Sequence, residues 1–145
     1  GAMELRLAAR STAMDTAWIV TLFDVGPDEK AEPVTAGFLR ASVRAVDETL
    51  SRDGAPVLDC RTAVAVPVGE VVEYRIPLVP NARRFAAGHR IRLEVRSEDQ
   101  SADATPIMGF RHASVGTSSL NTIAARSCIL LPVASLPRDD GAAHV

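Results

Sequence analysis

Hydrophobic and polar residues alternate along most of this chain of 145 residues. No window of helical length shows apolar residues recurring at every third and fourth position. In residues 89–96, Ile91, Leu93 and Val95 alternate with charged residues, which is typical of an antiparallel strand with one buried face. The pattern predicts seven strands, at residues 3–9, 17–25, 38–45, 70–78, 90–97, 121–125 and 127–133.

Turn-forming residues separate these strands. They lie at Gly26-Pro27-Asp28, Glu32-Pro33, Asp53-Gly54, Pro80-Asn81 and Ala87-Gly88. Residues 46–59 are irregular, and residues 98–119 form a long polar stretch without alternation that predicts an extended surface loop. Short strands joined by such turns predict an all-β fold, a jelly-roll β-sandwich that is mainly antiparallel.

The length of the chain fits one domain, which we place at residues 3–136. Residues 137–145 are expected to be a disordered tail. Gly1 and Ala2 resemble what a protease leaves after it removes a tag. Met3 is then either a natural start or an internal residue, because strand-like alternation begins at once after it.

Composition and charge exclude several classes of protein. With 47% hydrophobic and 23% charged residues, the chain has the profile of a folded protein. Its net charge is −2 and its charges are interspersed, so we expect no nucleic-acid partner. The most apolar stretch, residues 128–134, is far shorter than a membrane span of about 20 residues, so we expect no membrane partner.

Cys60 and Cys128 are the only cysteines, and a single pair in a chain of this length is no disulfide framework. Reduced thiols are therefore expected. The sequence leaves the compartment open, with the cytoplasm favoured.

Four stretches follow one another in a distinctive order. Residues 15–25, D-T-A-W-I-V-T-L-F-D-V, are followed by residues 37–44, G-F-L-R-A-S-V-R. Residues 69–95 contain G-E-V-V-E-Y and then F-A-A-G-H-R-I-R-L-E-V, and residues 127–133 are S-C-I-L-L-P-V. In this order and spacing they resemble the C-terminal domain of the CocE/NonD hydrolases, the group of cocaine esterases, α-amino-acid ester hydrolases and X-Pro dipeptidyl-peptidases. One departure is residues 97–101, where the family commonly has an aromatic and proline pair.

The resemblance implies a galactose-binding-like jelly roll that follows an α/β-hydrolase domain carrying a Ser-Asp-His triad. This chain would be the noncatalytic accessory domain, bracing the hydrolase domain and walling part of its substrate pocket. The parent would hydrolyse esters or X-Pro peptides, and the hydrolase domain would be the partner, with no cofactor. Some apolar surface should then be exposed where the two domains meet.

Two alternatives remain open. The chain could be a free-standing module that binds a carbohydrate or another small ligand through residues 98–119. It could also be an assembly domain that forms a homodimer through exposed strand edges.

The sequence assigns no catalytic residue and no metal ligand. The nearest approach to a nucleophile elbow, residues 112–116 around Ser114, lacks the first glycine. Only His144 follows it, in a tail that could not hold a triad base rigidly. His89, His112 and His144 share no spacing suited to metal ligands.

The remaining candidates are ligand contacts and structural residues. His112, Asp99 and Trp18 are candidate ligand contacts, although Trp18 is better explained as a core or interdomain residue because aromatic residues make up 4% of the chain. The structural candidates are Asp15, Asp24, Arg40, Gly88, His89 and Arg90.

The two aspartates flank one predicted strand, where such residues usually cap turns. The sharper alternative is a calcium site, although no dense acidic loop is present. His89 follows Gly88 at a strand start, where an imidazole can close a turn by bonding to the backbone or to a carboxylate.

Overall fold

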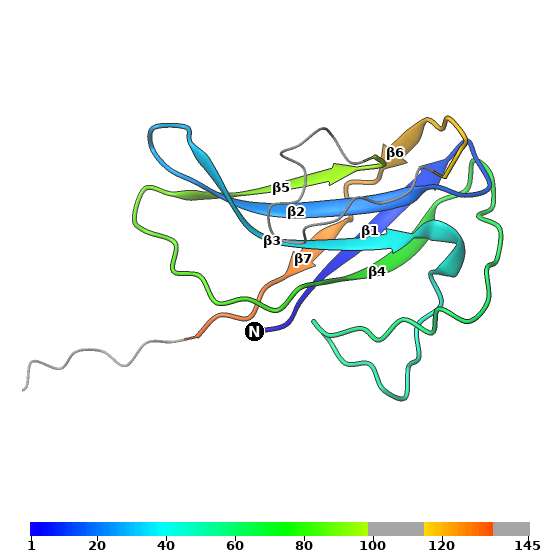
Figure 1. Cartoon of the computed structure of the whole chain (residues 1–145), viewed down its shortest axis with the longest axis horizontal. Coiled ribbons are helices and arrows are strands. Elements are labelled where there is room, and N and C mark those ends of the chain that lie inside the picture. The colour runs from blue at the N-terminus through cyan, green and yellow to red at the C-terminus, as the bar shows by residue number, and fades with distance from the viewer. Residues whose placement is uncertain (99–114, 135–145) are drawn as a thin grey trace, which may run out of the picture.

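The described residues, 1–98 and 115–134, form an antiparallel β-fold, seen in a computed structural model (Figure 1). The elements are β1 (Met3–Ser11), β2 (Ala17–Val25), β3 (Ala31–Arg40), the 3-10 helix η1 (Ala41–Val43), β4 (Val72–Leu78), β5 (Arg90–Arg96), β6 (Asn121–Ile123) and β7 (Cys128–Leu130). Every pairing between these strands is antiparallel. The prediction of an all-β, mainly antiparallel sandwich is confirmed.

The strands follow the order β5-β2-β3-β4-β1-β6, and β7 pairs with β1 beside β6. Pairing is continuous within two halves, β5-β2-β3 and β4-β1 with the short strands. Between the halves, β3 and β4 share a single register pair, Gly37 with Leu78. The sheet folds over at this pair, and Figure 1 shows β1 and β4 crossing β2 and β3 at an angle.

The core lies between the two halves. Trp18 of β2 packs on Tyr74 of β4, with ring centroids 5.4 Å apart and ring planes inclined by 58°. Burying such side chains stabilises the fold by about 1.5–3 kcal/mol each. The buried apolar cluster consists of Met3, Leu5, Leu7, Ala9, Trp18, Val20, Leu22, Val34, Leu39, Ala41, Val66, Tyr74, Ile76 and Leu78.

Strand β5 is an edge strand with a weakly buried face. Leu93 and Val95 pack against the core as predicted. Ile91, which the alternation placed on the same buried face, is 47% exposed. Ile91 lies near the start of this edge strand, opposite Asp24 at the end of β2.

The third strand was predicted wrongly at residues 38–45. Strand β3 covers Ala31–Arg40, and the chain then turns into η1. The turn begins where the Ala41 N–H donates to the carbonyl of Thr16 (2.8 Å). The Asp15 side chain then holds the Ser42 N–H (2.9 Å). These bonds end the strand where hydrophobicity alone predicted that it would continue.

The turn predicted at Glu32-Pro33 is also wrong, because both residues lie inside β3. Pro33 pairs opposite Phe23, next to a shift in register. Proline lacks an N–H and fits a strand at such an irregularity. The hairpin turns after β2, at the predicted Gly26-Pro27-Asp28 turn, where the Gly26 N–H donates to the Lys30 carbonyl (2.9 Å).

Strand β2 has the predicted bounds, and the other predicted strands are confirmed with shifted ends, β1 being longer and β4 to β7 shorter than expected. The predicted turns at Asp53-Gly54 and Ala87-Gly88 are confirmed, each with a glycine of positive φ. In the described part of the chain no helix is long and apolar enough to cross a membrane.

Substituting Gly37 with alanine should destabilise the fold. An added Cβ would lie 2.3 Å from the Pro77 carbonyl oxygen and 3.0 Å from the Leu78 Cα, so the two halves of the sheet would have to separate. Overpacking of this kind typically costs about 1–3 kcal/mol, which urea unfolding of the Gly37→Ala variant would measure.

Gly26→Ala is the matched control, because its added Cβ would meet the end of the flexible Asp28 side chain. Equal losses of stability in the two variants would show that the close approach of β3 to β4 at Gly37 is not what makes this position sensitive.

Candidate functional site

Asp15 joins the start of β2 to the end of β3. Its Oδ1 accepts hydrogen bonds from the N–H groups of Thr16 (3.0 Å) and Ser42 (2.9 Å). Its Oδ2 accepts from Arg40 Nε (2.7 Å) and Ser42 Oγ (2.9 Å). Burial alone would raise the pKa of Asp15, but the bonds from Arg40 and Ser42 outweigh it and lower the pKa below its usual value. The structure thus brings Asp15 and Arg40 into direct contact.

Asp24 holds the segment before β5 against the β2–β3 hairpin. The carboxylate is 2% exposed, and its Oδ1 lies 2.7 Å from His89 Nδ1. Its Oδ2 accepts from Arg83 Nε (2.9 Å), and Arg83 also donates to Glu32 (2.7 Å). Burial would raise the pKa of Asp24, but His89 and Arg83 together lower it below its usual value.

Gly88 and Arg90 flank His89 and set its position. Gly88 has a φ of 81°, and the His89 N–H donates to the Ala86 carbonyl (3.1 Å). Arg90 forms an ion pair with Glu29 in the β2–β3 turn. These contacts aim the imidazole of His89 at Asp24.

An imidazole held by a carboxylate is the base half of a catalytic triad. In the described residues, no hydroxyl or thiol is hydrogen-bonded to the His89 ring, whose recorded partner is Asp24. Among the residues that the structure describes, the pair has no nucleophile of the kind that a triad requires, and its geometry suits a clamp between loop and sheet.

Trp18 lies in the core with 2% of its surface exposed. It forms part of the wall of a shallow depression of about 370 Å³, together with residues of β5 and β6 such as Val95 and Asn121. Stacking on a sugar needs an exposed aromatic face, so the buried indole offers little area for it. His112 and Asp99, the other two candidate ligand contacts, lie outside the described residues, as does Ser114.

A buried ion pair on β1 was missed by the sequence analysis. The side chain of Glu4 is fully buried. It accepts hydrogen bonds from Arg75 Nε (2.6 Å), Arg75 Nη2 (3.2 Å) and the N–H of Gly54 (2.8 Å). Burial would raise the pKa of Glu4, but these bonds outweigh it and lower the pKa.

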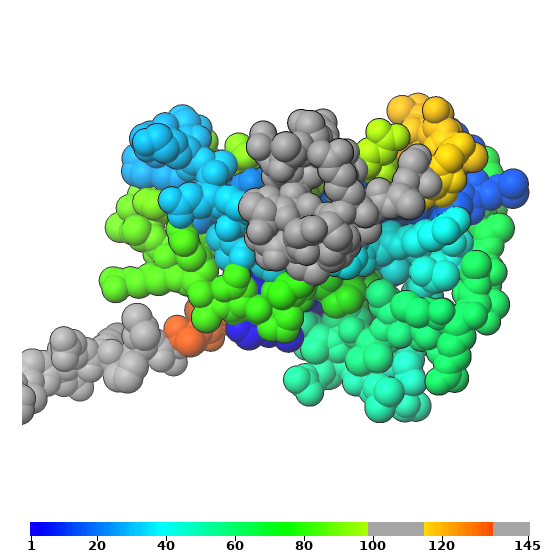
Figure 2. Space-filling view, in the orientation of Figure 1, coloured from blue at the N-terminus to red at the C-terminus, as the bar shows by residue number. Residues whose placement is uncertain are grey.

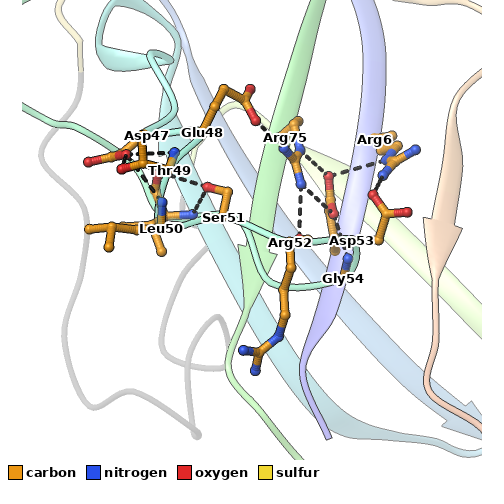
Figure 3. Close-up of polar contacts among 12 residues, drawn as sticks. Arg6, Asp47, Glu48, Thr49, Leu50, Ser51, Arg52, Asp53, Gly54 and Arg75 are labelled. Atoms are coloured by element: carbon orange, nitrogen blue, oxygen red, sulfur yellow. Dashed lines mark hydrogen bonds and ion pairs between the residues drawn. The ribbon is translucent and has the colours of Figure 1, made fainter.

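Arg75 and Arg6 extend this network into residues 46–59 (Figure 3). Arg75 donates to the carboxylate of Glu48 (3.2 Å) and to the carbonyl of Arg52 (3.1 Å). Arg6 pairs with Asp53 (2.5 Å). Alternation alone predicts a solvent-facing Glu4, and no local signal shows that a segment some 50 residues away covers it.

No three histidine, cysteine, aspartate or glutamate side chains gather as a metal-binding set in the portion that the structure describes. Cys60 and Cys128 are both free and exposed. The carboxylates of Glu4, Asp15 and Asp24 are each held by at least two donors within the chain, and these contacts hold loops in place.

A family model described as the X-Pro dipeptidyl-peptidase C-terminal non-catalytic domain matches residues 1–107. The chain is 32% identical over 99 residues to cocaine esterase of Rhodococcus sp. (strain MB1 Bresler), an alignment that covers 68% of this chain and 15% of that protein.

Two solved structures are also similar. A CocE/NonD family hydrolase from Staphylococcus aureus matches with a TM-score of 0.74 at 21% identity, over 89% of this chain and 27% of that one. An aminopeptidase from a marine sediment Thaumarchaeota archaeon matches with a TM-score of 0.56 at 28% identity, over 67% of this chain and 15% of that one. The chain thus spans less than a third of each relative's length.

Removing the charge of Glu4 should weaken the fold at neutral pH. Glu4→Gln leaves Arg75 without its buried counter-charge, which typically costs about 1–3 kcal/mol. Because the folded pKa of Glu4 is lowered, its stabilisation is complete above the usual pKa of about 4.3 and is lost as pH falls below it. Urea unfolding between pH 3 and pH 7 should therefore show a flatter pH dependence in the variant.

Glu73→Gln is the control, because Glu73 pairs with Arg126 at an exposed site, where ion pairs contribute about 0–1 kcal/mol. A Glu4→Gln variant with the stability and pH profile of this control would show that the buried network contributes nothing.

Breaking the Asp24 clamp should loosen the segment before β5. Asp24→Asn removes the negative charge that His89 and Arg83 share. Amide hydrogen exchange of residues 80–89 should then be at least about tenfold faster, because the free energy of local opening is lower. Asp28→Asn, in the exposed turn nearby, should leave that exchange unchanged, and identical exchange in both variants would argue against the clamp.

Proposed function

Because the chain belongs to the family of X-Pro dipeptidyl-peptidase C-terminal non-catalytic domains, we propose that it serves as the accessory domain of a CocE/NonD-type serine hydrolase. The observation that carries this proposal is the family match over residues 1–107. It agrees with the resemblance found in the four sequence stretches, which is thereby confirmed.

The parent protein would contain an α/β-hydrolase domain with the catalytic triad, and it would hydrolyse esters or X-Pro peptides. The relatives support this, since the chain matches 15% of the cocaine esterase and 27% of the staphylococcal hydrolase. The accessory domain would brace the hydrolase domain and form part of the wall of its substrate pocket.

The polar interior of the domain supports a bracing role. Glu4, Asp15 and Asp24 each lie at a junction between a strand and a loop. Each carboxylate is held by at least one arginine and one further donor, and charge-assisted bonds of this kind are strong. A domain whose loops are fixed in this way can present a rigid surface to a neighbour.

A carbohydrate-binding module is the weaker alternative. Such a module needs an aromatic platform that a sugar ring can reach. Trp18, the only tryptophan, is buried against Tyr74.

A paired assay separates an accessory role from an independent activity. We expect the full-length parent to hydrolyse a p-nitrophenyl ester or an X-Pro-nitroanilide, and the isolated 145 residues to hydrolyse neither. The physical reason is that the described polar groups include no nucleophile paired with a base. Release of nitrophenol or nitroaniline is the measurement.

The Ser114→Ala variant of the isolated chain is the control, because Ser114 is the nearest approach to a nucleophile elbow. Turnover by the isolated chain that disappears in this variant would overturn the accessory role.

A further inference from the structure

Three segments that meet at one end of the described molecule contain no charged side chain of their own, although Arg10, Arg61 and Glu70 flank them. Residues 11–14, residues 62–69 and residues 115–120 contain no aspartate, glutamate, lysine, arginine or histidine, although 23% of the chain is charged. We call these three segments the uncharged end. The β2–β3 turn, in contrast, contains Asp28, Glu29 and Lys30 in succession.

Backbone hydrogen bonds join the three segments. The Val66 N–H donates to the Met14 carbonyl (2.7 Å), and the Thr12 N–H donates to the Leu120 carbonyl (3.1 Å). Gly69 is tied to the end of β1 in the same way (2.9 Å). Figures 1 and 2 show the β1–β2 connection, the green segment before β4 and the yellow segment at β6 gathered on the right of the molecule.

Large apolar side chains project from this end into solvent. Met14 is 67% exposed, Leu120 is 72% exposed, and Val64 and Val68 are 53% and 55% exposed. Val71, just beyond the second segment, is 45% exposed. Apolar groups gathered over a few hundred Å² mark interaction surfaces on soluble proteins.

The uncharged end is also held rigid. Val66 is 1% exposed and anchors the middle of the second segment in the core. Arg44 donates to the carbonyls of Ala41 (3.1 Å) and Val64 (2.8 Å), which fixes the start of that segment against η1. A preorganised surface loses less conformational entropy when a partner covers it.

We propose that the uncharged end is the surface that docks on the catalytic part of the same polypeptide. This inference rests on the proposed function. Two domains of one polypeptide stay docked when the interface between them is large and hydrophobic, whereas a polar interface lets them move relative to one another. Two findings indicate that a hydrolase domain covers this surface. The chain matches a family of non-catalytic C-terminal domains, and it spans a small share of each relative.

The test uses the full-length polypeptide with Val68→Glu and Leu120→Glu combined. Each substitution places a charge where the partner surface would have to exclude water, which is strongly unfavourable. In the wild-type polypeptide, amides of residues 62–69 should exchange at least tenfold more slowly than in the isolated chain, and the double variant should lose this protection. Its hydrolase activity should then match that of the polypeptide from which this domain is deleted.

Two controls define the result. Val133→Glu changes a 91% exposed valine outside the uncharged end, and it should change neither exchange nor activity. The isolated chain with the double substitution should keep its melting temperature, because both side chains are already exposed.

Three outcomes would overturn the inference. If the double variant behaves like Val133→Glu while deletion of the domain still lowers activity, the docking surface is wrong and the proposed function stands. If deletion of the domain leaves the hydrolase unchanged, the proposed function itself fails. If the isolated chain sediments as a dimer that the double substitution dissociates, with no effect in the full-length polypeptide, the surface belongs to a second copy.

Discussion

The sandwich depends on the close approach of two strands at one corner. Strands β3 and β4 share a single register pair, Gly37 with Leu78, where the Pro77 carbonyl occupies the space that a Cβ of residue 37 would need. Because the sheet can fold over at this point, Trp18 and Tyr74 come into contact and the two halves bury a common core. The loops that carry the polar clamps and the uncharged end start from strands that this core positions.

Three carboxylates among the described residues act as clamps. Hydrogen bonds from arginine, histidine, hydroxyl or backbone donors lower the pKa values of Glu4, Asp15 and Asp24 below their usual values. Each of these carboxylates ties a loop to a strand. Buried carboxylates at active sites commonly have raised pKa values, because burial favours the neutral form. The direction of all three shifts therefore agrees with a domain whose polar residues stabilise its own structure.

Alternation predicted the strands because it reports which side of each strand meets the core. It succeeded for β2, whose bounds at Ala17–Val25 match the prediction, and for Tyr74 and Ile76 of β4, which are buried on one face. It failed at Pro33, since local turn propensity gives no information on the bulge that admits a proline into β3. It failed at Glu4, since the segment that covers this residue lies far along the chain.

The candidate site was less predictable than the fold. The sequence analysis named Asp15, Arg40, Asp24 and His89 as single residues. Which of them form pairs depends on strand register, which the sequence does not give. The uncharged end was predicted only as some exposed apolar surface. Its three segments are far apart in sequence, and only the backbone bonds between them define it.

We propose that this noncatalytic domain docks on a hydrolase domain of its own polypeptide. A crystal structure of the full-length polypeptide tests it most directly. We predict that residues 62–69 and 115–120 lie buried against an α/β-hydrolase domain that holds the catalytic serine. A structure in which those residues face solvent, or in which the reactive serine is one of residues 1–145, would contradict the proposal.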